Sequence, residues 1–476
     1  MIRNPCLTDL HEFLRRPGPA IDRSRIVSLD FLAGDPVSTA REVQTADLQA
    51  EWDIEGGSSI TAWSDLKRLG QVLIIEEISK ELIEDLGSRF DIDPWFFASY
   101  IRRAWRNTNT QNTATCTLPS RERNQDFLPL YYHRTLSFES IGAELVQLRR
   151  KSQHERKVFV MPKMAGERIG LAQHFCSILL IQCGSHGWKS LILADPSMDD
   201  EYLPGKRNSP LPPVIPSKLF LGGCEDFSSG REPGSNSLRS PRPTNRGMLE
   251  ELVYYWSLEA PPMFNPNQPT LQSIAYYPLK IVAAEWVNYV AVMGLTMKDF
   301  ELSTKTSSDL SADLTKLNSN LRGLQAWRRR VLSTQGKLQQ VNRFIKRQHK
   351  LHGQHDDWEA LLEDYEHIGA EVEEHGHRLE AMIPVVTSAV QLVESRRSLI
   401  ETANVTRLTV LALIFIPLTY IASIFSMSDQ FGPSGSEFWV YFTVAVPVTL
   451  IVILIAKPPT RLASYVANIT RGFKEH

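Results

Sequence analysis

The sequence lacks the motifs on which an enzyme assignment would rest. Its 476 residues contain no GxxxxGK[ST], HExxH or GxSxG motif, and no GxGxxG follows a strand pattern. Carboxylates are abundant, but no spacing singles out a pair for acid–base chemistry. We therefore expect a protein that is not an enzyme and that has no organic cofactor.

The sequence also lacks an excess of charge and a cysteine framework. The formal net charge is −2, whereas a dedicated nucleic-acid binder is strongly basic, so no nucleic-acid partner is expected. The first 20 residues lack the apolar core of a signal peptide, which predicts a cytosolic N-terminal part. The five cysteines have no CxxC spacing, which favours reduced thiols; they are Cys6, Cys116, Cys176, Cys183 and Cys224.

Two runs near the C-terminal end lack charged residues altogether. Residues 408–427 and 438–456 are each about long enough to cross a hydrocarbon core of ~30 Å, so we predict two transmembrane helices in a lipid bilayer. Two core helices of a soluble protein are the alternative. The aromatic residues that begin the second run disfavour it, because Trp and Tyr concentrate at membrane interfaces.

The charges around these runs predict the topology. Arg396, Arg397 and Arg407 precede the first run, basic residues follow the second, and the loop 428–437 has no Lys or Arg. By the positive-inside rule both termini face the cytosol. The sequence does not indicate which membrane holds the protein.

The N-terminal half has the alternating pattern of an α/β domain. The run VLIIEEI from Val72 predicts a buried strand, and Ser79 is a candidate N-cap for the helix that follows. Pro94 suits the first turn of a second helix, to Arg106. Further strands are predicted at Leu130–His133, Lys157–Met161, His174–Gln182 and Lys189–Leu193, so that residues 60–203 form a mixed α/β domain.

Two segments beside this domain have weaker patterns. Residues 1–60 predict one strand, at Arg25–Phe31, and little else. Residues 204–246 are rich in Pro, Ser and Gly, which is typical of a disordered surface insertion. A regulatory phosphorylation segment is the alternative for this insertion.

Residues 247–405 predict a helical hairpin that continues into the first span. Leucines at 310, 314, 317, 321 and 324 begin a seam of alternating three- and four-residue steps, which breaks near Gly353 and resumes at Trp358. The second helix would continue to Met427, about 100 Å in all, with Pro384 as an interior kink. Because the hairpin covers only part of this seam, we predict a homo-oligomer with the first span, in residues 406–476, nearest its axis.

The C-terminal region resembles a known family. The segment LVESRRSLIETANVTRLTVLALIFIPLTYIASIFSM, with the short acidic loop and second span, resembles the CorA-like magnesium transporter superfamily, closest to its divergent eukaryotic, fungal-type branch. QVLIIEEISKELIEDLGSRFDIDPWFF and GWKSLILADP resemble its cytosolic domain. The resemblance implies a funnel-shaped homopentamer with an α/β cytosolic domain, a long helical stalk and a two-helix transmembrane hairpin. Its first span would line a pore for magnesium or another divalent cation.

The resemblance also places candidate pore residues. The family's first span ends in Gly-Met-Asn, where this sequence has Ser426, Met427 and Ser428. A serine hydroxyl reaches less far than an asparagine amide, so a ring of Ser428 would hold a hydrated cation less selectively. Asp429 and Glu437 could add negative potential from the outer loop. Leu408, Ile416 and Thr419 match pore-lining positions and share a helical face with Ala412 and Ser423; a helix-packing face is the alternative.

A second candidate site lies in the cytosolic part. Six of the twelve histidines fall between His349 and His377, among many carboxylates. In the resembled family, cations bound between neighbouring cytosolic domains keep the pore shut, and this segment could hold them. A solvated helix face is the alternative, and His375, on the seam, could instead sense pH. The candidate regulatory ligands are Asp356, Asp357, Glu363, Asp364, His367 and His375.

Two functions remain open from the sequence. The first is a channel-type divalent cation transporter with passive flux and cytosolic cation gating. The second is a non-conducting membrane-anchored sensor or scaffold of the same architecture, because Ser-Met-Ser replaces Gly-Met-Asn.

Overall fold

The chain divides into two compact units. The α/β unit comprises Met1–Thr304 and Leu324–Met382, and the span unit comprises Lys305–Gly323 and Ile383–His476. The computed structural model describes residues 5–16, 24–33, 39–48, 68–101, 125–138, 147–150, 154, 156–164, 167–183, 187–197, 202–204, 216–224, 226–227, 247–303, 310–352, 355–427 and 437–456.

In the described part of the chain, ten strands form one sheet in the α/β unit. Its order is β2-β1-β3-β8-β7-β6-β5-β9, and β4 pairs with both β7 and β10. The β3–β8 pair is parallel, and the other recorded pairs are antiparallel. The strands are β1 Arg25–Leu32, β2 Thr39–Val43, β3 Arg68–Glu76, β4 Phe127–Phe138, β5 Gln147–Arg150, β6 Lys157–Met164, β7 Glu167–Gln182, β8 Trp188–Ala194, β9 Tyr202–Pro204 and β10 Ser217–Leu219.

The longest strand, β7, organises the sheet. One of its edges pairs with β4 along most of its length, and the other pairs first with β6 and then with β8. Eleven of its residues are buried in succession, from Ile169 to Leu179, because both faces of the sheet are covered here. A strand buried on both faces has a continuous apolar run instead of alternation, and this pattern made the strand predictable.

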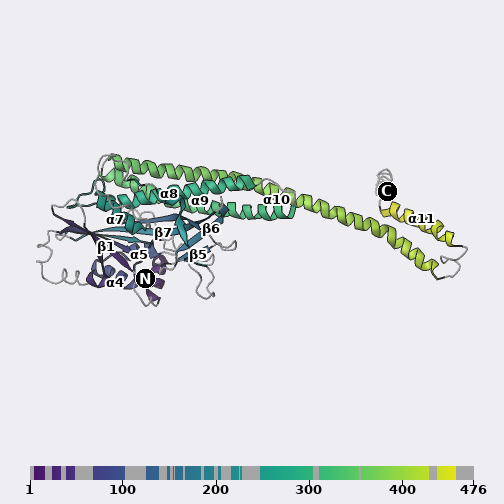
Figure 1. Ribbon diagram of the computed structural model, residues 1–476, viewed down its shortest axis with the longest axis horizontal. Helices are drawn as coiled ribbons and strands as arrows, with labels where there is room; N and C mark the ends of the chain where they lie inside the picture. The colour runs from purple at the N-terminus through teal and green to yellow at the C-terminus, as the bar shows by residue number, and fades with distance from the viewer. Residues whose placement is uncertain are drawn as a thin grey trace, which may run out of the picture. The chain divides into compact units, whose positions relative to one another are not determined.

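Helices cover both faces of the sheet (Figure 1). The helices α4 (Lys80–Arg89) and α5 (Pro94–Ile101) pack on one face, where side chains such as Leu73 and Ile75 meet Leu82 and Phe96. On the other face lie α7 (Met248–Leu258) and α8 (Leu271–Ser303), which contact β2, β3, β4, β6 and β7. The N-terminal α1 (Thr8–Arg15) contacts α5.

Several sequence-based predictions are confirmed in this unit. Strands occur where β1, β3, β4, β6, β7 and β8 were expected, and α4 and α5 begin at the predicted positions. The Ser79 hydroxyl accepts a hydrogen bond from the Leu82 N–H at 3.4 Å, as an N-cap does. The end of the second predicted helix, at 102–106, lies outside the described residues.

The long helices form a three-helix layer in the α/β unit. Lys346 of α9 (Leu310–His352) pairs with Glu366 of α10 (Asp356–Phe425) at 2.7 Å, and Arg328 pairs with Glu380 at 3.4 Å. The residue numbers rise on α10 as they fall on α9, so the predicted antiparallel hairpin is confirmed. The sequence predicted helical structure in this region but not the packing of α8 beside α10: the Tyr365 hydroxyl donates to the carbonyl of Leu279 at 2.9 Å.

The predicted seam is buried over most of its length. Trp358, Leu361 and Tyr365 are fully buried on α10, and burial continues to Val393, beyond which the seam positions of a single chain are exposed. Met382 and Ala389 on this stripe are only half-buried. The structure therefore covers the first part of the seam within one chain and leaves the last three positions, from 396 to 403, open.

Part of the Pro/Ser/Gly-rich segment 204–246 has regular structure. Ser217–Leu219 form β10, which pairs with the end of β4, and Phe220 of the following 3₁₀ turn is buried. Phe227 stacks on Tyr255 of α7 with ring centroids 3.9 Å apart. These described residues attach the segment to β4 and to α7.

Candidate functional site

The span unit contains two uncharged helices that contact each other. The second is α11 (Phe438–Ala456), which coincides with the second predicted span. The first is the last part of α10, which ends at Phe425, two residues before the predicted end of the first span. Tyr441 reaches back to α10: its hydroxyl donates to the Leu418 carbonyl at 3.5 Å, and its ring lies 6.2 Å from that of Phe425.

These apolar helices differ from the other long apolar helix of the chain. Leu271–Leu302 is also long and apolar enough to cross a membrane, but 56% of its apolar stretch is buried, as expected of a core helix. In Asp356–Phe425 the buried share is 6%, and large side chains such as Phe415 and Tyr420 are exposed. An uncharged helix with exposed apolar side chains is stable in lipid and not in water. The end of α10 and α11 are therefore the candidate membrane spans.

The face of α10 that contacts α11 is not the predicted pore-lining face. Pro417 and Ile421 are buried, and Ile421 is only 4% exposed. At 3.6 residues per turn, these two positions and Phe425 lie opposite the predicted lining positions, which occupy an arc of about 80°. In the single chain all five lining positions are exposed: Leu408, Ala412, Ile416, Thr419 and Ser423.

Hydroxyl groups on the span are satisfied within the helix. The Thr419 hydroxyl donates to the carbonyls of Phe415 and Ile416 at 2.8 and 2.9 Å. Thr409 donates in the same way to the carbonyl of Val405 at 2.9 Å. A threonine that back-bonds in this way keeps lone pairs on its oxygen, so Thr419 still presents an acceptor on the lining face.

The predicted mouth residues follow the end of the helix. Ser426 donates its N–H to Ala422 at 2.9 Å, and Met427, 88% exposed, donates to Ile424 at 3.3 Å. Ser428 and Asp429 lie outside the described residues. Glu437 lies directly before α11 and its carbonyl accepts the Val440 N–H at 3.0 Å, a position where a carboxylate suits the helix dipole.

The predicted regulatory residues lie along one side of the hairpin without meeting in a single chain. Asp364 is bound by Lys280 of α8 at 2.6 Å, and Asp357 lies 3.3 Å from His355. Asp356, Glu363 and His367 occupy other turns of α10. Among the described residues, no three His, Cys, Asp or Glu side chains are grouped closely enough to hold a metal ion.

His375 is half-buried on the seam. Gly294 of α8 lies beside the His375 imidazole: a Cβ at this glycine would be in ordinary van der Waals contact with the Nε2, at 3.5 Å. Burial lowers the pKa of His375 below 6.5, although Glu371 on the same helix opposes this effect. The histidine is therefore predominantly neutral near pH 7.

Sequence reasoning missed two buried charge clusters in the α/β unit. In the first, Arg134 of β4 lies 2.8 Å from Glu285 of α8 and 3.5 Å from Glu251 of α7, and all three are buried. Burial raises the pKa of Glu285 to about 7, partly offset by Arg134. Asn288 on α8 donates to the thiol of Cys224 at 3.4 Å, which connects the 204–246 segment to this helix. The cluster joins the sheet to both helices that cover it.

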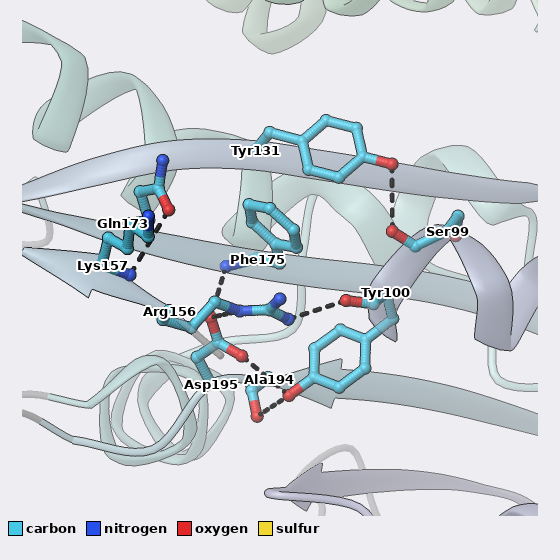
Figure 2. A network of polar contacts seen from close by, with 9 residues as sticks. All are labelled: Ser99, Tyr100, Tyr131, Arg156, Lys157, Gln173, Phe175, Ala194 and Asp195. Atoms are coloured by element: carbon cyan, nitrogen blue, oxygen red, sulfur yellow. Dashed lines mark hydrogen bonds and ion pairs between the residues drawn. The ribbon is translucent and has the colours of Figure 1, made fainter. Parts of the chain in front are cut away.

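The second cluster, shown in Figure 2, lies on the other face of the sheet. The Arg156 Nε and the Phe175 N–H both donate to one Asp195 oxygen at 2.8 Å, and the Tyr100 hydroxyl donates to the other at 3.0 Å. Arg156 also donates to the Tyr100 carbonyl at 2.7 Å and lies over the Phe175 ring. No sequence signal marks this cluster, since single arginines and aspartates are usually exposed.

These observations define a class of protein in which the last long helix of an α/β unit continues into the first of two apolar candidate spans. Residues 257–457 match the family model described as "CorA-like Mg2+ transporter protein". This region of the chain is similar to the CorA-like family, which confirms the resemblance seen in the sequence. It includes α8, α9, α10 and α11.

Other comparisons give more distant similarities. A comparison with curated protein sequences gives no match. The solved structure described as the complete structure of the CorA magnesium transporter from Methanocaldococcus jannaschii aligns with 90% of this chain and 96% of its own, at 10% identity and a TM-score of 0.39. The full-length CmaX protein aligns with 91% of this chain and 98% of its own, at 10% identity and a TM-score of 0.40.

Proposed function

We propose that the protein is a channel-type transporter of a divalent cation, with magnesium as the first candidate. The observation that carries this proposal is the division of the first span into two faces. α11 packs on the face of Pro417 and Ile421, and the uncharged face with Leu408, Ile416 and Thr419 remains uncovered in one chain. Copies of the chain arranged around an axis would bring these faces together as the wall of a pore.

The proposed assembly is a funnel-shaped homopentamer. The exposed end of the α10 seam, from Arg396 to Ala403, supports self-association, because no part of the described chain covers it. The basic residues on both sides of the spans support cytosolic termini. Flux is passive, because neither apolar run contains the ionisable residue that a proton-coupled mechanism would need.

Gating is proposed to depend on cations bound between subunits. Asp356, Asp357, Glu363, His367 and His375 remain candidate ligands, and a neighbouring subunit would have to supply the partners that one chain does not group. Asp364 is the least suited of the set, since Lys280 already neutralises it at 2.6 Å.

A second candidate function is a non-conducting membrane-anchored sensor or scaffold. The Ser426-Met427-Ser428 triplet favours it, because serine hydroxyls reach less far toward a hydrated cation than asparagine amides. Purified protein in proteoliposomes with a magnesium indicator separates the two functions. If the natural chain passes no divalent cation but the variant with Ser426→Gly and Ser428→Asn does, the transporter proposal is wrong.

The lining face is tested by one substitution on two sides of the same helix. Ile416→Trp should reduce flux at least tenfold, because each subunit would place an indole in the pore. Ile424→Trp, away from the lining arc, is the matched control and should change flux less than twofold. Equal flux in both variants would contradict a pore lined by this face.

The assembly is tested separately from conduction. Chemical crosslinking in mild detergent should give a ladder that ends at five subunits. A protein that stays monomeric at every crosslinker concentration would contradict the stalk-centred oligomer.

A further inference from the structure

A basic pocket in the α/β unit lies apart from every residue assigned above. It has a volume of about 630 Å³ and lies between the first residues of β4 and the last third of α9. Phe127, Leu128 and Pro129 of β4 form an apolar floor, and all three are buried. The size is within the range of about 300–1,000 Å³ that is usual for small-molecule sites.

The opposite wall of the pocket is cationic. Arg343, Lys346, Arg347 and Lys350 of α9 line it, and no carboxylate is among its described lining residues. The nearest recorded neutralising contact is Glu366 of α10, which binds Lys346 at 2.7 Å.

The spacing of these cations destabilises the helix. Arg343 and Arg347, like Lys346 and Lys350, are four residues apart, so each pair places like charges side by side on one helical face. A bound anion would remove this repulsion. The helix dipole also favours cations near the C-terminal end of α9. It does not explain why an apolar floor faces them.

The shape of the charged wall indicates the class of anion. From Arg343 to Lys350 the cations extend over about 10 Å of helix, which is longer than one phosphate group and suits a chain of phosphates. Phe344 and Leu351, the latter 63% exposed, add apolar surface beside the cations. A ligand with a polyphosphate and a planar apolar group would contact both kinds of surface.

We propose that this pocket binds a nucleoside polyphosphate, with the phosphates on α9 and the base against the start of β4. Such a site would let the α/β unit respond to a soluble anion independently of the ion pathway. The proposal does not depend on whether the protein conducts ions.

Equilibrium dialysis of the full-length protein in detergent with radiolabelled ATP tests the site. A chelator in the buffer prevents binding of magnesium to the protein from contributing. The doubly substituted variant Arg343→Ala/Arg347→Ala should bind ATP at least tenfold more weakly. Arg322→Ala/Arg329→Ala, which removes the same charge from exposed positions elsewhere on α9, is the matched control and should bind within twofold of the natural chain.

The apolar part of the site has its own test. Leu351→Ser changes an exposed side chain, so the fold is preserved, and it should weaken ATP binding about threefold without weakening inorganic tripolyphosphate. Tripolyphosphate should bind at least tenfold more weakly than ATP to the natural chain.

Several results would overturn the proposal. If ATP does not bind at 1 mM, which corresponds to about −4 kcal/mol, the cations serve only to stabilise the C-terminal end of α9. Equal loss of binding in the two double variants would indicate nonspecific charge attraction. Tripolyphosphate that binds as well as ATP, or a short-chain anionic phospholipid that displaces ATP at a tenfold lower concentration, would contradict a nucleotide as the ligand.

Discussion

Replacing Asp195 by asparagine should strongly destabilise the α/β unit. Asp195 and Arg156 are both fully buried, and their side chains meet at 2.8 Å. Asparagine keeps the volume of the side chain, and its Oδ1 can still accept hydrogen bonds from the Arg156 Nε and the Phe175 N–H while its amide group donates to the Tyr100 hydroxyl oxygen. The main loss is the negative charge that neutralises Arg156.

The size of the effect follows from what would remain around Arg156. The guanidinium would keep its hydrogen bond to the Tyr100 carbonyl at 2.7 Å and its contact with the Phe175 ring, 3.8 Å from the centroid. Removing one partner of a buried ion pair costs about 3–5 kcal/mol. Because these two contacts persist, we expect the lower end, about 3 kcal/mol. The α/β unit has about 360 residues. At about 2.1 cal/mol/K of unfolding entropy per residue, 1 kcal/mol lowers its Tm by about 1.3 °C, so the expected decrease is about 4 °C.

The assay is thermal unfolding of the full-length protein in detergent, followed by intrinsic fluorescence. Glu380→Gln is the matched control, because it removes a carboxylate from an exposed pair with Arg328 in the same unit. It should cost under about 1 kcal/mol. Hydrogen exchange should locate the Asp195→Asn effect in β7 and β8.

A second variant tests the electrostatic reasoning itself. Replacing both partners, as Arg156→Met/Asp195→Leu, leaves no unpaired charge and should lower Tm less than Asp195→Asn alone. If Asp195→Asn lowers Tm no more than Glu380→Gln does, Arg156 is hydrated and the reasoning fails.

Three further predictions concern the same unit. The pKa of Glu285 rises from 4.5 to about 7 on folding, so protonation of this carboxyl favours the folded state. The natural chain should therefore lose about 3 kcal/mol of stability as pH rises from 4.5 to 7. Thermal unfolding across this pH range should show no such loss in Glu285→Gln. The pKa of His375 is lowered in the folded state, so stability should fall as pH decreases below 6.5. A His375→Gln variant that loses as much stability in acid as the natural chain would contradict this role of His375. At Gly70 a Cβ would collide with the indole of Trp188. Gly70→Ala should therefore lower the free energy of unfolding by about 1–3 kcal/mol. A Tm within 1 °C of that of the natural chain would show that the indole moves aside without cost.

The elements that the sequence predicted well have strong local signals. The parallel strands β3 and β8 are short apolar runs, Ser79 is a recognisable cap, and the seam of α10 repeats over many turns. The two spans were predictable because an uncharged apolar stretch of about twenty residues matches the thickness of a bilayer and is uncommon in water-soluble domains. The exposed face of α10 with Leu408, Ile416 and Thr419 also follows from a periodicity that can be counted in the sequence, and its role as a pore lining stays a proposal.

The elements that were missed depend on long-range partners. β5 has the sequence QLRR, which shows no apolar alternation, and becomes a strand only because β6 and β9 pair with it. Arg156 and Asp195 are 39 residues apart, and nothing near either one indicates a buried pair. The metal-ligand prediction rested on composition along one helix, and it stays a prediction because the proposed sites lie between subunits.

The parallel pairing of β3 with β8 sets an order of events during synthesis. Gly70 pairs with Trp188, so one edge of the apolar strand β3 has no partner until 118 more residues have been made. At about 5–20 residues per second this interval is roughly 6–24 s, during which an unpaired edge can associate with other chains. The first candidate span, from Leu408, begins 214 residues after the end of β8 at Ala194. The sheet can therefore close before the ribosome delivers any apolar segment to a membrane, and a chaperone that shields β3 would be needed early and not at insertion.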